Sequence, residues 1–246
     1  HITLDVQEEF FKKIISYIIK ANGLYEQEYP NMCSDRYIIS EKLIQIAEEE
    51  NTDLVAHGST GQGNDQVRFD SAIFSLKPDF KVIAPIRELE ISRKHEQKFL
   101  ESKGFSVDKN YKKYTINQNI FGYTHSGNEI DKYKEPGQEA YILTKLTNNE
   151  PEYIKIEFLH GLPVKLNNNP LPGIEILKEL NTIAGSHGFG KKLIINNTII
   201  GIKGRILFEA PGILTIIKAH KALEKAVLTK EQYDFNQVVS EKWANL

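Results

Sequence analysis

The chain has 246 residues, of which 40% are hydrophobic and 26% are charged, and its formal net charge is -2. A nearly neutral chain of ordinary composition lacks the broad positive field that attracts nucleic acid or an anionic membrane. Its single cysteine, Cys33, excludes an internal disulfide framework and a multi-cysteine zinc site. No apolar run approaches the roughly 20 residues of a membrane span, and no signal peptide opens the chain. The expected compartment is the cytoplasm, with neither nucleic acid nor a membrane as a partner.

The first hundred or so residues are predicted to alternate helices with strands. Asp5 and Glu8 have the spacing of a helix cap, and apolar residues then recur at helical intervals. Two short apolar runs further along predict buried strands on either side of a helix, which indicates one strand–helix–strand unit. The predicted helices cover about residues 6–21, 37–49, 65–77 and 92–104, and the predicted strands lie in 53–58 and 80–85.

From about Lys109 the chain changes character and becomes polar, glycine-containing and poor in aliphatic residues up to about residue 140. This stretch predicts a linker or a segment that forms a site. A later hairpin is predicted to turn at Asn196 and Asn197. The remaining predicted strands cover 152–159 and 162–168, and the remaining helices cover 173–185, 211–227 and 229–243. An α/β part, residues 1–110, is therefore expected to precede an α+β part, residues 111–246.

A glycine-rich segment, HGSTGQGNDQVRF, follows the first predicted strand at residues 57–69. A loop that leaves a parallel strand and enters a helix is where open α/β sheets bind ligands, and its glycines let backbone N–H groups approach an anion. The side chains of Thr60, Asn64, Asp65 and Arg68 suit a zwitterion such as an amino acid. The alternative is a glycine-rich turn in which Asp65 caps the helix and Arg68 forms a surface ion pair.

Read as AHGSTGQGNDQVRFD, this segment resembles the signature of the argininosuccinate synthase family. Other segments resemble the family in the same order along nearly the whole chain: ANGLYEQEYP, KVIAPIREL, YTINQNIFG, PEYIKIEFLHGLPVKLN, LNTIAGSHGFG, GIKGR and FEAPGILTIIKAHKALE. The resemblance implies a partial adenine-nucleotide-binding parallel sheet of the ATP-pyrophosphatase type in residues 1–110. It implies an α+β synthetase domain in residues 111–246.

The resemblance also implies an activity. The family is an ATP-dependent ligase of arginine biosynthesis that condenses citrulline with aspartate through a citrullyl-adenylate, releasing AMP and pyrophosphate. The expected partners are citrulline, aspartate and ATP, with Mg²⁺ as the usual counter-ion of the nucleotide. The expected assembly is a homotetramer in the cytoplasm.

Residue by residue, the resemblance implies a set of substrate contacts. The backbone at Gly58 would contact ATP. Aspartate would be held by Thr60, Asn64 and Asp65. Citrulline would be held by Tyr29, Ser34, Asn64, Arg68, Thr115, Thr124, Asn196 and Phe208. No catalytic residue and no metal ligand is assigned. Without the resemblance, Tyr29 reads as a half-buried loop aromatic and the two threonines read as turn residues.

Four of these positions depart from the family's usual residues. Thr115 and Thr124 stand where the family usually has serines, and both keep the hydroxyl, so the other two changes matter more. Asn196 stands where the family has a glutamate, and Phe208 stands where it has a tyrosine, so a carboxylate and a hydroxyl are lost. A lost hydrogen bond to a charged group costs ~1.5–3 kcal/mol. The changes favour weaker citrulline binding or a different acceptor substrate. The alternatives are compensation by Asn197 or Glu209, or a one-residue slip of the alignment in the hairpin.

The family's pyrophosphate-binding sequence, SGGLDTS in its usual form, does not occur in the 246 residues. The chain is therefore expected to be a fragment that lacks this amino-terminal loop and a carboxyl-terminal tail, and to be inactive alone. Two other functions stay open at this point. One is a non-catalytic homologue that binds amino acids, and the other is a related ligase with a different acceptor.

Overall fold

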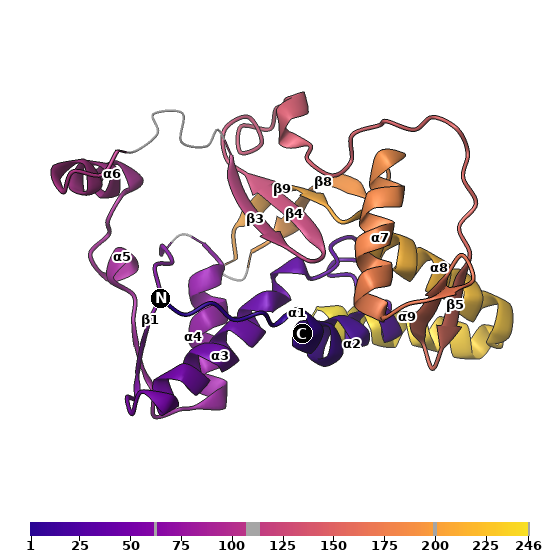
Figure 1. Cartoon of the computed structure of the whole chain (residues 1–246), viewed down its shortest axis with the longest axis horizontal. Coiled ribbons are helices and arrows are strands. Elements are labelled where there is room, and N and C mark those ends of the chain that lie inside the picture. The colour runs from indigo at the N-terminus through magenta and orange to yellow at the C-terminus, as the bar shows by residue number, and fades with distance from the viewer. Residues whose placement is uncertain (62, 107–113, 199–200, 246) are drawn as a thin grey trace. The chain divides into compact units, whose positions relative to one another are not determined.

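A computed structural model describes residues 1–61, 63–106, 114–198 and 201–245, and Figure 1 shows its elements in chain order. The residues form two compact units. The larger unit comprises His1–Met32, Tyr114–Asn196 and Gly204–Leu246, and the smaller unit comprises Cys33–Lys113 and Asn197–Lys203. The boundary expected near residue 110 falls outside the described residues and stays a prediction.

The smaller unit contains the predicted strand–helix–strand arrangement. Its strands β1 and β2 pair in parallel, with Val55 opposite Val82, and α4 connects them. Apolar side chains of α3 and α4 close over β1, and this core contains Ile44, Ala47, Val55 and Ile73. The elements are α3 (Asp35–Glu49), β1 (Leu54–Ala56), α4 (Asp65–Leu76), β2 (Lys81–Ile83), α5 (Pro85–Glu88) and α6 (Arg93–Ser102). The predicted parallel unit is confirmed.

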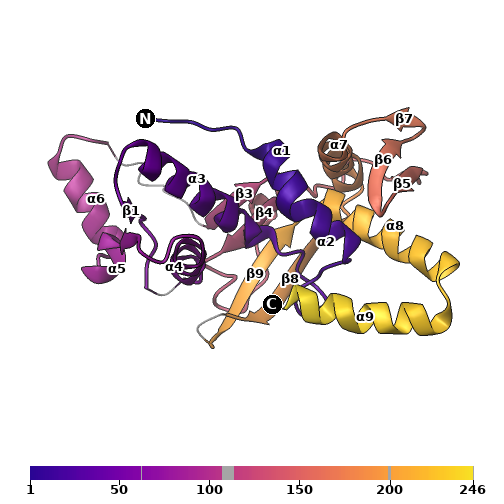
Figure 2. The same cartoon turned by 90° about the horizontal axis from the view of Figure 1, so that it is seen from below.

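The larger unit carries the remaining helices. The amino-terminal helix is continuous but changes its hydrogen-bond pattern along its length, as α1 (Gln7–Phe10), a π-helical stretch (Phe11–Ile15) and α2 (Ser16–Lys20). The later helices are α7 (Gly173–Ser186), α8 (Pro211–Val227) and α9 (Lys230–Ala244), and short 3₁₀ turns occupy Met32–Ser34 and Gln138–Ala140. Gly212 lets α8 approach α7, because a Cβ atom there would lie 2.4 Å from the Leu177 carbonyl oxygen. Figure 2 shows α8 and α9 folding back on each other as a helical hairpin.

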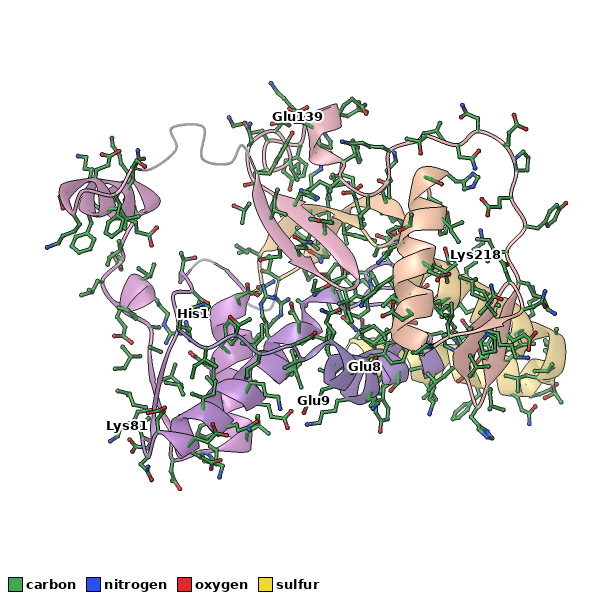
Figure 3. The ribbon with its side chains drawn as sticks, viewed as in Figure 1. His1, Glu8, Glu9, Lys81, Glu139 and Lys218 are labelled. Carbon is green, nitrogen blue, oxygen red and sulfur yellow. The ribbon has the colours of Figure 1, made fainter. Side chains whose placement is uncertain are left out.

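Two antiparallel sheets complete the larger unit. One has the strand order β3-β4-β9-β8, and the other has the order β5-β6-β7. The strands are β3 (Thr115–Asn119), β4 (Gly122–Ser126), β5 (Ile156–Leu159), β6 (Leu162–Leu166), β7 (Asn169–Pro170), β8 (Lys191–Asn197) and β9 (Lys203–Glu209). Side chains project from every element of both units, as Figure 3 shows.

Two expectations about these strands need correction. Part of the stretch predicted as a linker or a segment that forms a site is the β3–β4 hairpin, in which Asn117 pairs with Thr124, so this part is not a linker. The later hairpin does not turn at Asn196 and Asn197, because both residues still belong to β8. The turn follows them: the Thr198 N–H donates to the Ile202 carbonyl oxygen at 2.9 Å. Residues 199–200 of this predicted hairpin lie outside the described residues.

Candidate functional site

The glycine-rich loop joins β1 to α4, as the sequence predicts. Asp65 is the first residue of α4 and Asn64 is its N-cap residue, so Asp65 does not cap the helix. Gly58 and Thr60 are exposed, and a Cβ atom added to Gly58 would meet no heavy atom within 4 Å. The backbone at Gly58 is therefore open to the approach of a ligand. Gln62 belongs to the predicted loop but lies outside the described residues.

Asp65 lies between two guanidinium groups. Its Oδ2 atom is 2.9 Å from Arg36 Nη2, and its Oδ1 atom is 3.0 Å from Arg68 Nη1. Arg36 also donates from Nη1 to Asp35 Oδ1 at 2.7 Å. Burial tends to raise the pKa of Asp65, but the hydrogen bonds and positive charges of Arg36 and Arg68 outweigh it and hold that pKa below its usual value. Asp65 is thus kept as an anion.

Arg36 was not among the residues selected from the sequence. It lies at the start of α3, 29 positions before Asp65, and no local spacing links the two. Only the packing of α3 beside α4 brings them together. The sequence does contain one signal that could have identified it. Asp35 and Arg36 directly follow Ser34, a predicted site residue, and together they form a charged group at the start of a predicted helix.

Two buried polar atoms close to this cluster in the sequence have no hydrogen-bond partner in the described part of the chain. They are Ser34 Oγ and Arg36 Nε. Such atoms lose solvation without compensation unless a ligand or water supplies a partner. Ser34 is one of the residues predicted to contact citrulline, and its hydroxyl is free to do so. Burial raises the pKa of the neighbouring Cys33 thiol, which is therefore a poor nucleophile.

His57 connects the base of the loop to two further charged residues. Its Nε2 atom lies 3.0 Å from Asp70 Oδ1, and Arg87 Nη1 lies 2.6 Å from Asp70 Oδ2. The Ser59 N–H donates to His57 Nδ1 at 3.3 Å, which places the proton of a neutral ring on Nε2. The ring also stacks on Phe69, with the ring centres 5.5 Å apart. His57 therefore fixes the start of the loop.

The candidates in the larger unit gather on one sheet. Each strand of the four-stranded sheet carries one of them: Thr115 on β3, Thr124 on β4, Phe208 on β9 and Asn196 on β8. Asn117 pairs with Thr124, which pairs with Phe208, and Thr115 is two residues from Asn117. Because residues alternate between the faces of a strand, Thr115, Thr124 and Phe208 share one face.

Tyr29 lies against this face. Its ring meets the ring of Phe208 edge to face, with the centres 5.5 Å apart. Phe208 is 0% exposed and Tyr29 is also buried, whereas Asn196 is half-buried. The larger unit therefore brings together Tyr29, Thr115, Thr124 and Phe208, of the residues selected from the sequence.

Glu209 lies on the opposite face of the same sheet and is 0% exposed. Its carboxylate accepts hydrogen bonds from the N–H groups of Ile142, Leu143 and Thr144 and from the Thr144 hydroxyl. His125 Nε2 lies 3.4 Å from Glu209 Oε2. Burial tends to raise the pKa of Glu209, but His125, Thr144 and the backbone N–H donors outweigh burial and hold that pKa below its usual value. Because its carboxylate is fully engaged, Glu209 cannot replace the glutamate that is missing at Asn196.

Within residues 1–61, 63–106, 114–198 and 201–245, no three His, Cys, Asp or Glu side chains are grouped so as to hold a metal ion. Across the same described ranges, every helix is too short or too polar to cross a membrane.

The model for the arginosuccinate synthase N-terminal HUP domain matches residues 1–106, and the model for the arginosuccinate synthase C-terminal domain matches residues 114–246. The chain belongs to the argininosuccinate synthase family. The family predicted from the sequence is confirmed, as is the α/β class of its first part.

Curated argininosuccinate synthases are similar to this family member over its full length. The chain is 42% identical to the Xanthomonas axonopodis pv. citri enzyme, 39% identical to that of Sulfurisphaera tokodaii and 40% identical to that of Methanocaldococcus jannaschii. In each case the match covers 100% of this chain but only 61%, 64% and 63% of the relative, respectively. The chain thus spans about six tenths of the length of the argininosuccinate synthases it matches.

Proposed function

We propose that the protein is an ATP-dependent ligase that condenses citrulline with aspartate to argininosuccinate, for arginine biosynthesis. One observation supports the proposal beyond family membership: Asp65, which directly follows the loop that contains Thr60 and Asn64, is held as an anion between Arg36 and Arg68. A fixed carboxylate beside hydroxyl and amide groups suits the ammonium and carboxylate groups of an amino acid.

The reaction requires two displacements. The ureido oxygen of citrulline attacks the α-phosphorus of ATP, and pyrophosphate leaves. The amine of aspartate then attacks the ureido carbon of the citrullyl-adenylate, and AMP leaves. Holding the reactants in line removes translational freedom and is worth roughly 7–11 kcal/mol when the geometry is ideal.

The residues of this chain would bind and orient the reactants. Gly58 would offer its open backbone to ATP, and Asp65 would attract the aspartate ammonium group. Arg68 would exchange its contact with Asp65 for the citrulline carboxylate, while Arg36 keeps Asp65 paired. The remaining citrulline contacts are proposed for Tyr29, Ser34, Asn64, Thr115, Thr124, Asn196 and Phe208.

Further parts of the proposal concern the whole protein. We assign nucleotide binding to residues 1–110 and the synthetase part to residues 111–246, and we propose a homotetramer in the cytoplasm. Mg²⁺ would enter as the counter-ion of ATP. No protein ligand is assigned to it, because the described residues contain no cluster of three potential metal ligands.

The role of Asp65 gives the sharpest test. In the full-length protein, we expect Asp65→Ala to abolish the use of aspartate, because the anion that attracts its ammonium group is lost, while citrulline-dependent exchange between ATP and pyrophosphate stays measurable. The control is Asp79→Ala, which removes an exposed carboxylate after α4 and should change neither. Aspartate binding is measured by calorimetry, and exchange is measured with labelled pyrophosphate.

Two results would contradict the assignment. If Asp65→Ala removes exchange while aspartate still binds, Asp65 serves the first displacement and not aspartate recognition. If citrulline supports no exchange while another acceptor does, the chain is a ligase for that acceptor, in line with the altered residues Asn196 and Phe208.

A further inference from the structure

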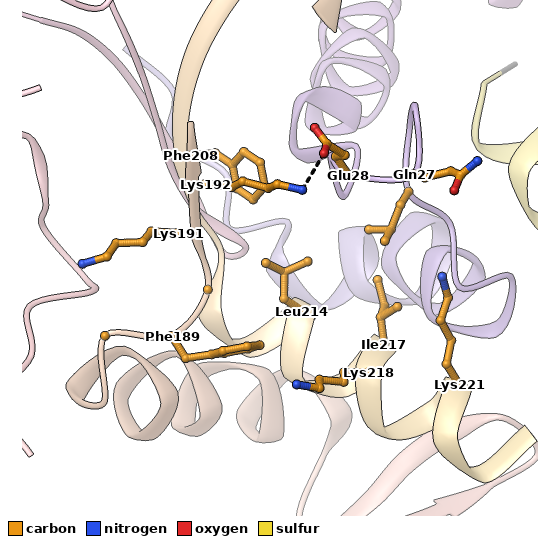
Figure 4. Close-up of a pocket in the computed structure, with 13 residues that line it drawn as sticks. Gln27, Glu28, Phe189, Lys191, Lys192, Phe208, Leu214, Ile217, Lys218 and Lys221 are labelled. Carbon is orange, nitrogen blue, oxygen red and sulfur yellow. Dashed lines mark hydrogen bonds and ion pairs between the residues drawn. The ribbon is translucent and has the colours of Figure 1, made fainter. Parts of the chain in front are cut away.

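A pocket of about 560 Å³ opens in the larger unit beside α8 (Figure 4). It lies between the loop that contains Leu24 and Glu28, the segment Gly188–Lys192 and one side of α8. Its volume falls in the range of sites that bind small organic molecules. Among its lining residues only Phe208 belongs to the proposed citrulline site, so the pocket is a separate feature.

The walls of the pocket are largely apolar. Leu24, Phe189, Leu214 and Ile217 line it together with Phe208. Two of these are aromatic: Phe189 follows α7 and Phe208 belongs to β9, so both precede α8 in the sequence. Such walls favour a ligand with an apolar body, because binding removes apolar surface from water on both partners.

The polar groups of the pocket are mostly ammonium groups. Lys192 pairs with Glu28, which is the one acidic residue among those that line the pocket. Lys218 Nζ lies 5.5 Å from the centre of the Phe189 ring. Lys191 is already engaged, because its Nζ donates to the Thr144 carbonyl oxygen, and Figure 4 shows it pointing away from the other lysines.

Two of the lysines that line the pocket, Lys218 and Lys221, have no acidic partner at close range among the described residues. In the described part of the chain, no carboxylate oxygen lies within 4.0 Å of the Nζ atom of Lys218 or Lys221. Lys221 is half-buried, and its burial lowers the pKa of its ammonium group although the charge of Glu224 opposes the change. An anion in the pocket would supply the partner that both lysines lack.

We propose that this pocket binds a small organic anion with an apolar body, that is, an aryl or branched alkyl carboxylate, sulfonate or phosphate. Its apolar body lies against Leu214, Ile217 and Phe189, and its charged group meets Lys218 and Lys221. A metal ion is excluded by the excess of positive charge. A bare inorganic anion leaves the apolar walls uncovered and binds less well.

The test uses 8-anilinonaphthalene-1-sulfonate as the probe, since it is an aromatic anion whose fluorescence rises in apolar surroundings. We expect one saturable site whose affinity falls with added salt. The double variant Lys218→Glu, Lys221→Glu should bind the probe about tenfold less tightly, because two attractive charges become repulsive. Lys225→Glu is the matched control: it reverses an exposed charge on the same helix, outside the pocket, and should leave the affinity unchanged.

Competition identifies the chemistry of the ligand. Benzoate should displace the probe, whereas inorganic phosphate at the same concentration should not. If inorganic phosphate displaces the probe and benzoate does not, the site recognises negative charge only. That result would overturn the proposal. Equal loss of affinity in the double variant and in Lys225→Glu would also overturn it.

Two checks complete the experiment. Circular dichroism confirms that each variant is folded, and Leu214→Ala provides a second variant that weakens the apolar contact without changing charge. If sedimentation shows a dimer that excludes the probe and Leu214→Ala restores monomers, the pocket is an interface and the proposal fails. The assay contains no ATP, citrulline or aspartate, so its outcome is independent of the proposed ligase activity.

Discussion

The glycine-rich loop and the four-stranded sheet hold their charged residues in different ways. Around the loop, charged side chains contact one another and stay partly exposed, as in the contacts of Asp65 with Arg36 and Arg68. In the sheet, the face with the candidate residues carries hydroxyl and aromatic groups, and the acid Glu209 is sealed on the other face. A partly exposed charged side chain can give up a contact within the protein for a contact with a ligand. A fully buried carboxylate such as that of Glu209 instead fixes the backbone groups that it binds.

The largest expected effect follows from removing the sealed acid. Glu209→Ala would remove the acceptor of the N–H groups of residues 142–144, of which that of Thr144 is buried, and would leave His125 without its acidic neighbour. We expect a loss of about 3–5 kcal/mol in the free energy of unfolding, measured by urea denaturation. Glu179→Ala, an exposed position on α7, is the control and should change it by less than about 0.5 kcal/mol.

The dependence on pH tests the same contact. Because the pKa of Glu209 is lower in the folded chain, its contribution is complete above the pKa of an unfolded glutamate, about 4.3, and is lost as the pH falls through the lower folded value. Glu209→Gln should therefore weaken the acid dependence of stability. An unchanged acid dependence would mean that the carboxylate is not held as an anion.

A smaller effect is expected at the loop, and it concerns binding more than stability. Arg36→Met would leave Asp65 with Arg68 as its remaining arginine partner and would raise the pKa of Asp65 toward its usual value. We expect about tenfold weaker aspartate binding, measured by calorimetry, because Arg68 is then tied to Asp65.

Arg36→Lys provides the comparison for that variant. It keeps the positive charge but cannot bridge Asp35 and Asp65 with a planar guanidinium, so partial recovery of aspartate binding is expected. If Arg36→Met binds aspartate as well as the original protein does, Arg36 has no part in positioning Asp65.

The smallest effect concerns the sheet face. Phe208→Tyr adds the hydroxyl that the resemblance to the family leads us to expect there, and citrulline should then bind up to about tenfold more tightly by calorimetry. Phe235→Tyr adds the same hydroxyl at an exposed position of α9 and serves as the control. A loss of stability without tighter binding would show that the hydroxyl points into the packing against Tyr29 and not toward a ligand.

Helices and the parallel unit were predictable because their apolar residues recur at a clear period. The strand β3 was missed since its TINQN sequence is mostly polar, and its pairing with β4 depends on contacts that sequence spacing does not reveal. The turn after β8 was misplaced because two asparagines imitate a turn signal while remaining in the strand.

The candidate site was predictable where a family signature exists and not elsewhere. Thr60, Asn64, Asp65 and Arg68 follow from the loop sequence, and their substrate roles stay predictions. Arg36 was missed, and Glu209 was considered only as a substitute for Asn196, because each contacts residues far away in the chain: Arg36 reaches across 29 positions and Glu209 reaches across 65. Local patterns carry no information on such contacts.

The larger unit is built from chain segments that are synthesised far apart in time. His220 bonds Asn22 across 198 positions, and Thr144 meets Glu209 across 65. On the ribosome, the amino-terminal helix must therefore wait for α8 to emerge, while most of the smaller unit is made in one run and can close first. Until then the apolar side of the amino-terminal helix lacks the α8 surface against which it packs.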